Sequence, residues 1–198
     1  VAPNLATNER LYVGEKNGIQ IPFSFIKIGS SSYWSYYSDS TITIDSVQFK
    51  LYFDDSLKNS DLGPLELYFN PDSHFNENSS TYLDYDGFSI SDWHALGDPM
   101  VLERTDSSDL YIHSELIWRI DSLMSLLSDS GVTRTFALKF ANSDSNFMEL
   151  FSEEASIEEK DPKVVLFYRR TSTSATDSII IDTLSSSIYS SADLSIFD

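Results

Sequence analysis

The sequence lacks cysteine, is poor in basic residues, with 13 Lys and Arg against 31 Asp and Glu, and has no apolar run long enough for a membrane helix. The absence of cysteine excludes disulfides, thiolate metal sites and cysteine catalysis. A net charge of −18 repels phosphate backbones and anionic lipids. We therefore expect no nucleic-acid partner and no membrane span.

The length and the hydrophobic content of the chain are sufficient for a folded domain. The chain has 198 residues, of which 41% are hydrophobic, including 13 Phe and 11 Tyr. A chain of this length usually forms one domain and buries roughly 70% of its unfolded surface. Serine, threonine, asparagine and aspartate crowd between the apolar segments, a composition that favours an extracellular or cell-surface protein.

The apolar residues mostly recur with a period of two, which is typical of strands with one buried face. In residues 47–53, apolar Val47, Phe49 and Leu51 alternate with polar or half-polar side chains. Ile42 and Ile44 have the opposite parity, so we expect a bulge near residues 45 and 46. We expect further strands over residues 19–28, 65–69, 115–120, 136–140 and 163–168.

A single segment has helical spacing. Leu123, Met124 and Leu127 predict a short helix over 122–129, with Asp121 or Ser122 as its N-cap. Many short strands with one helix are typical of an all-β fold. We expect an antiparallel β-sandwich of jelly-roll type with one short helix and a C-terminal tail that bears strands.

The composition changes after the last of these strands. We expect a β-sandwich domain over 1–170 and a Ser-rich tail over 171–198, with linkers at 171–178 and 185–191. Two apolar pieces lie in this tail, one at Ile179 and Ile181, and the other at Leu194, Ile196 and Phe197. The tail is too short to bury these residues by itself, so it needs a surface to pair with.

The order of the segments resembles that of DNRLRE-type domains. Residues 9–14, ERLYVG, and 23–28, FSFIKI, resemble the LYVG…FIKF opening of that family. Residues 42–52, 74–82, 118–121, 136–139, 151–155 and 162–168 resemble later elements of the family in the same order, with Phe75 and Tyr82 where Trp is usual. The resemblance implies an extracellular β-sandwich module, of a kind that in some members binds polysaccharide.

The resemblance also suggests a role for the tail. In DNRLRE-type domains a short strand usually precedes the LYVG segment, and residues 191–197 look like that strand at the other end of the chain. It either folds back onto its own sandwich or completes the next copy by strand addition. We expect the second, with the intersubunit strand made by Ile179, Ile181, Leu194, Ile196 and Phe197.

A Ser-rich segment over 30–40 contains four aromatic residues, Tyr33, Trp34, Tyr36 and Tyr37. Such rings stack on pyranose faces, and Trp93 is a candidate for the same surface. The same residue types also favour packing onto the sandwich or lying in a protein interface. A polysaccharide site at these five residues and a structural role both remain open.

Acidic residues in loops suggest a structural calcium site, although no known calcium-loop spacing is complete. The candidates are Asp84 with Asp86 and Gly87, and Asp54 with Asp55 and Asp61. In a chain with 31 acidic residues, such pairs are expected by chance in loops, and solvated turns are the better explanation. The metal, if there is one, stays unknown, and no other cofactor is expected.

Nothing in the sequence indicates catalysis. His74, His94 and His113 are the only histidines, and none lies in a metalloprotease or nucleophile-elbow pattern. We therefore expect a non-catalytic extracellular structural or adhesive subunit whose partners are other copies of itself, polymerising into a surface filament by tail-strand addition. The alternative is a carbohydrate-binding module of a larger secreted protein.

Overall fold

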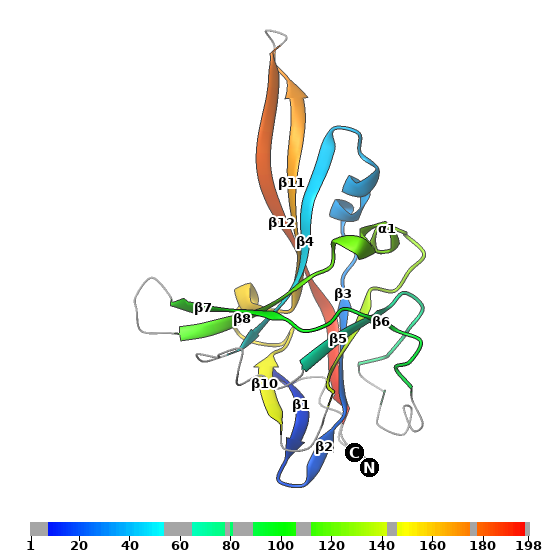
Figure 1. Cartoon of the computed structure of the whole chain (residues 1–198), viewed down its shortest axis with the longest axis vertical. Helices are drawn as coiled ribbons and strands as arrows, with labels where there is room; N and C mark the ends of the chain where they lie inside the picture. The colour runs from blue at the N-terminus through cyan, green and yellow to red at the C-terminus, as the bar shows by residue number, and fades with distance from the viewer. Residues whose placement is uncertain are drawn as a thin grey trace.

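A computed structural model describes residues 8–53, 65–77, 80, 89–105, 112–141, 146–174 and 178–196. These form two antiparallel sheets (Figure 1). The first contains β1 (Arg10–Lys16), β2 (Ile19–Ile21), β4 (Ile42–Phe53), β7 (Met100–Thr105), β8 (Ile112–Arg119), β10 (Phe147–Phe151), β11 (Lys163–Thr173) and the first half of β12 (Ile179–Ile196). The second contains β3 (Phe23–Ile28), β5 (Leu65–Asn70), β6 (His94–Ala95), β9 (Thr135–Phe140) and the second half of β12.

The two sheets bury one main core between them. Phe49 of β4 and Phe136 of β9 face each other across it, with ring centroids 4.4 Å apart. Every other residue of β4 from Val47 to Leu51 is fully buried, as are Leu65, Leu67 and Phe69 of β5. The predicted all-β sandwich is confirmed, and its jelly-roll connectivity stays a prediction.

The expected bulge in β4 is present. Ser46 pairs with Phe167 and Ile44 pairs with Tyr168, so Asp45 is the extra residue between them. The bulge turns both apolar sets of β4 toward the same core. The Asp45 carboxylate leaves the ladder and accepts hydrogen bonds from Arg169 Nε and Nη2 at 3.0 and 2.8 Å.

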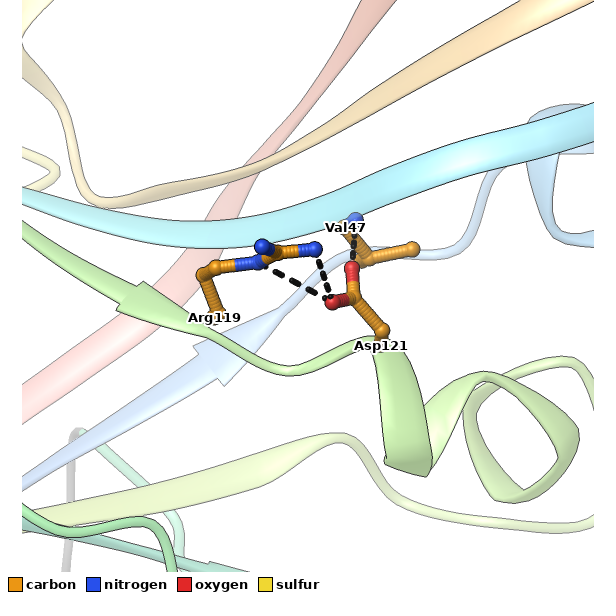
Figure 2. Close-up of polar contacts among 3 residues, drawn as sticks. All are labelled: Val47, Arg119 and Asp121. Atoms are coloured by element: carbon orange, nitrogen blue, oxygen red, sulfur yellow. Dashed lines mark hydrogen bonds and ion pairs between the residues drawn. The ribbon is translucent and has the colours of Figure 1, made fainter.

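The expected helix lies after β8, as a 3-10 turn η4 (Asp121–Leu123) that continues into α1 (Met124–Leu127). The predicted N-cap is wrong, because Ile120 holds that position and no side chain caps the helix. Asp121 instead bonds the backbone of Val47 in β4 and the side chain of Arg119 (Figure 2). The described residues also form the 3-10 helices η1 (Ser32–Ser38) and η5 (Glu158–Lys160).

Of the two Ser-rich stretches predicted as linkers, residues 171–173 and 185–191 form strand, residues 174 and 178 do not, and residues 175–177 lie outside the described residues. β11 continues to Thr173, and β12 runs without interruption for 18 residues from Ile179. Serine and threonine accept the extended conformation readily once a neighbouring strand supplies backbone hydrogen bonds. β12 pairs with β11 along residues 179–189 and with β3 along 190–196, so one strand belongs to both sheets.

Candidate functional site

The predicted aromatic loop is the helix η1, and serine hydroxyls stabilise its turns. Ser31 accepts a hydrogen bond from the Tyr33 N–H, and the hydroxyls of Ser35 and Ser38 donate to carbonyls three residues earlier. Each serine thus satisfies a backbone group that a short helix leaves exposed. The serines therefore explain the helix without any ligand.

Trp34 belongs to the main core. Its side chain is only 3% exposed, its Nε1 donates to the Gly29 carbonyl at 3.1 Å, and the Arg134 guanidinium lies 4.7 Å from its ring centre. Arg134 in turn donates to the carbonyls of Leu127 and Asp129 at the end of α1. The indole is thus mostly enclosed, although it also lines a hollow beside Ser35 and Arg134, and its role in polysaccharide binding stays a prediction.

The three tyrosines of η1 differ in exposure. Tyr36 makes edge-on contacts with Tyr33 and Tyr168, and its hydroxyl accepts a hydrogen bond from Arg170 at 3.1 Å. These contacts attach η1 to β11. Tyr37 is 55% exposed, so it is the residue of the predicted group whose ring is most open to a ligand.

Trp93 lies in a different place from η1. It is buried with Phe25, Leu194 and Ile196 in a second cluster, in which its ring centre lies 5.9 Å from that of Phe25. The structure therefore does not join Trp93 to the η1 aromatics. The five predicted residues divide into two buried indoles in separate clusters and three tyrosines on one helix.

Sequence reasoning missed a groove beside β1, β2 and β10. It has a volume of about 330 Å³, and Tyr12 and Phe147 lie stacked there with ring centroids 6.0 Å apart. Lys16 lies over the Phe147 ring and pairs with Glu149 at 2.8 Å, and Ile19 at the rim is half exposed. These residues come from two segments far apart in the sequence, so no local motif indicates the groove.

An acidic cluster lies where the end of β12 meets two loops. The carboxylates of Glu77, Glu154 and Asp193 approach within 4.8 Å of one another, and Asp193 is 3% exposed. Its Oδ2 accepts a 2.7 Å hydrogen bond from the Glu153 N–H, and its own N–H donates to Glu77 Oε1 at 3.0 Å. The cluster thus fixes the last residues of β12 to both loops.

Two carboxyl groups of this cluster, those of Glu154 and Asp193, have raised pKa values. Burial, followed by the charge of Glu77, raises the pKa of Glu154 to about 7, and burial raises the pKa of Asp193 well above its ordinary value. The predicted calcium residues Asp54, Asp55, Asp61, Asp84, Asp86 and Gly87 lie outside the described residues, so a calcium site stays a prediction.

The residues predicted for the intersubunit strand differ in burial along β12. Leu194 and Ile196 are buried, and they pair with Phe25 and Phe23 of β3 in the same chain. Phe197 lies outside the described residues. Ile179 and Ile181, by contrast, are 73% and 61% exposed.

The two exposed isoleucines lie on a hairpin of β11 and β12 that projects beyond the rest of the fold (Figure 1). We call residues 169–187 the arm. The ladder between β4 and β11 ends at Arg170, so beyond that residue the arm consists of two strands only. All residues from Ser178 to Ser185 are exposed.

Comparison with known proteins finds no family model, no curated protein and no solved structure that matches this chain. The DNRLRE resemblance is not tested by this result and stays a prediction. Of the helices in the described parts of the chain, none has the length and apolar character needed to cross a membrane.

Proposed function

We propose that this chain is a non-catalytic, extracellular structural or adhesive subunit that assembles with other copies of itself through β12. The observation that carries the proposal is the arm. A two-stranded ribbon that projects into solvent gains little stability from its own burial, and isolated hairpins are marginal in water. A partner that covers the arm supplies the missing contacts.

The side chains of the arm support a partner of this kind. Ile179, Ile180, Ile181 and Leu184 are all at least 40% exposed, and they lie within six residues of one another on β12. Exposed apolar residues that cluster on a projecting element mark interaction surfaces more often than single exposed ones do.

The second half of β12 offers a route to a filament. Leu194 and Ile196 cover the outer side of Phe25 within the same chain. If residues 190–196 exchanged between neighbours, each copy would bury the same contacts with the next, and a head-to-tail exchange propagates. The register shift between Ser190 and Ala192 marks the position where β12 would bend away.

The test uses substitutions in the arm, because deletion of residues 171–198 would also remove the buried Leu194 and Ile196. We expect the chain of 198 residues to assemble in sedimentation velocity and negative-stain imaging, and the double variant Ile179→Ser with Ile181→Ser to lose that assembly. Ile19→Ser is the matched control, since Ile19 is 51% exposed on β2. A wild-type chain that stays monomeric at high concentration would refute the proposal.

A second candidate function is carbohydrate binding, and the groove beside β1 favours it. The stacked rings of Tyr12 and Phe147 form an apolar platform in this groove. Lys16 and Glu149 in the same lining add the polar groups that a sugar site needs. For a chain that binds a polysaccharide here, Tyr12→Ala would reduce its retardation in affinity gels, and Tyr37→Ala would not. Equal retardation of both variants and the wild type would remove the groove from consideration.

A further inference from the structure

The first half of β12 has one paired edge and one open edge. β11 pairs with residues 179–189 on one side, and β3 pairs on the other side only from Ser190 onward. Among the strands that the structure describes, none pairs with the β3 side of residues 179–187. In Figure 1 this stretch is the outer strand of the arm, with β11 between it and β4.

The backbone groups that face the open edge follow from two hydrogen bonds at the base of the arm. The Tyr189 carbonyl accepts from the Gly29 N–H, on the β3 side, at 3.0 Å, and the Ser190 N–H donates to the Pro162 carbonyl at the start of β11, at 2.8 Å. Successive residues of an antiparallel strand direct these groups to opposite sides. The β11–β12 ladder has no register shift, so the odd-numbered residues from 179 to 187 face the open edge.

This edge lacks the usual features that prevent strands from pairing. Natural edge strands carry lysine, proline or a bulge, or are very short. Residues 179–187 contain no lysine and no proline, and their one charged side chain, Asp182, lies opposite Arg170 in the ladder. They form a regular ladder with β11 and include four exposed aliphatic side chains. The backbone groups of this edge can therefore form hydrogen bonds with another strand.

Charge indicates which strand it accepts. The whole chain has a net charge of −18, so most faces of two copies repel each other. Among the described residues of the arm, Arg169, Arg170 and Asp182 are charged, and Asp182 is the one charged residue of the stretch 179–187. Asp182 also lies opposite Arg170 in the ladder. The described part of the arm thus lacks the excess of negative charge that the whole chain carries, so a second acidic copy can approach it more readily than it can approach most other faces.

We propose that two copies of this chain pair arm to arm, by antiparallel addition of β12 to β12 along residues 179–187. The inference rests on the proposed function and names the contact through which assembly begins. The pairing joins β11 and β12 of both copies into one four-stranded sheet. It is isologous, so by itself it closes as a dimer, and a filament needs the exchange of residues 190–196 in addition.

The register follows from the length of the open edge. A two-fold axis at Thr183 lets all five outward-facing residues of each copy pair, with Thr183 opposite Thr183 of the second copy. It places each Asp182 opposite Leu184 of the second copy. A shift of one residue, with the axis at Asp182, would place the two aspartates directly opposite each other, which is destabilising.

The absence of cysteine permits a direct test by cross-linking. Facing residues of a hydrogen-bonded antiparallel pair lie about 5.5 Å apart at Cα, within disulfide range. We expect Thr183→Cys to form a covalent dimer under mild oxidation. Ser172→Cys is the matched control, because Ser172 is exposed on β11, one strand away from the edge, and should stay monomeric.

A second variant tests the open edge by removing one of its backbone hydrogen-bond donors. Thr183→Pro deletes an outward N–H and leaves the β11 ladder intact, so we expect loss of the dimer in sedimentation velocity with an unchanged melting temperature. If the wild type assembles and Thr183→Pro assembles equally, or if Thr183→Cys cross-links no better than Ser172→Cys, arm-to-arm pairing is wrong while assembly through β12 stands. If the wild type is monomeric at high concentration, both proposals fail.

Discussion

The carboxylate of Asp121 accepts a 2.5 Å hydrogen bond from the backbone N–H of Val47, two residues after the bulged Asp45 (Figure 2). The Val47 carbonyl in turn accepts from the Ile120 N–H at 2.9 Å. The β8 ladder ends at Arg119, so the Asp121 side chain supplies the acceptor that the next rung would have provided. This bond sets the start of η4 and α1 against β4.

Loss of this acceptor should destabilise the fold. Asp121→Ala leaves the N–H of the fully buried Val47 without its partner, and we expect the free energy of unfolding to fall by about 1–3 kcal/mol. Arg119→Ala is the control, because the exposed Arg119–Asp121 pair should contribute at most about 1 kcal/mol. Denaturant titration measures both, and equal effects of the two variants would contradict this account.

The acidic cluster predicts a stability that depends on pH. The pKa of Glu154 is raised from 4.5 to about 7 in the folded chain. The contribution of Glu154 to the free energy of unfolding is therefore fully present below pH 4.5 and is lost as pH rises through about 7. Asp193 and Glu153, whose pKa values are also raised by burial, act in the same direction. We expect the melting temperature to fall across this range.

The variant Glu154→Gln distinguishes the effect of the cluster on the pH dependence of stability from the effect of the chain's overall negative charge. The glutamine cannot ionise, so the fall in melting temperature between pH 4.5 and 7 should become shallower than in the wild type. Glu149→Gln is a suitable control, since Glu149 is an exposed partner of Lys16 on β10. A profile for Glu154→Gln that overlays the wild type would show that the cluster does not titrate as described.

Gly14 should tolerate no side chain. Its φ is 101°, and a Cβ atom there would lie 1.9 Å from the Asn146 carbonyl oxygen. Gly18, in the Asn17-Gly18 turn between β1 and β2, also has a positive φ but has open space around it. We expect Gly14→Ala to cost on the order of 3 kcal/mol and Gly18→Ala about 1 kcal/mol, measured by denaturant unfolding. Equal costs would indicate that the backbone conformation alone matters at both positions.

Trp34 and Tyr37 should behave oppositely when each is replaced by alanine. Trp34→Ala removes a buried indole and should cost about 3–5 kcal/mol of stability. Tyr37→Ala removes an exposed ring and should leave stability within about 0.5 kcal/mol. Thermal unfolding of both variants checks this, and a Trp34→Ala protein as stable as the wild type would show that Trp34 does not contribute to the core as described.

Much of the β-structure was predictable because alternation is a local property of the chain. The parity change between Ile44 and Val47 predicted the bulge at Asp45, since only an extra residue brings both apolar sets to one core. The helical spacing of Leu123, Met124 and Leu127 predicted α1 in the same way. In each case neighbouring residues carry the whole signal.

Contacts between distant residues decided the rest. Nothing local shows that Trp34 lies beneath Arg134, or that Glu77, Glu154 and Asp193 share one cluster. The Ser-rich residues 185–191 suggested a linker, yet they form strand because β11 and β3 satisfy their backbone groups. The sequence by itself determined which faces of the strands are apolar. Only the tertiary structure decided which edges are paired, because backbone hydrogen bonds between strands do not depend on side-chain identity.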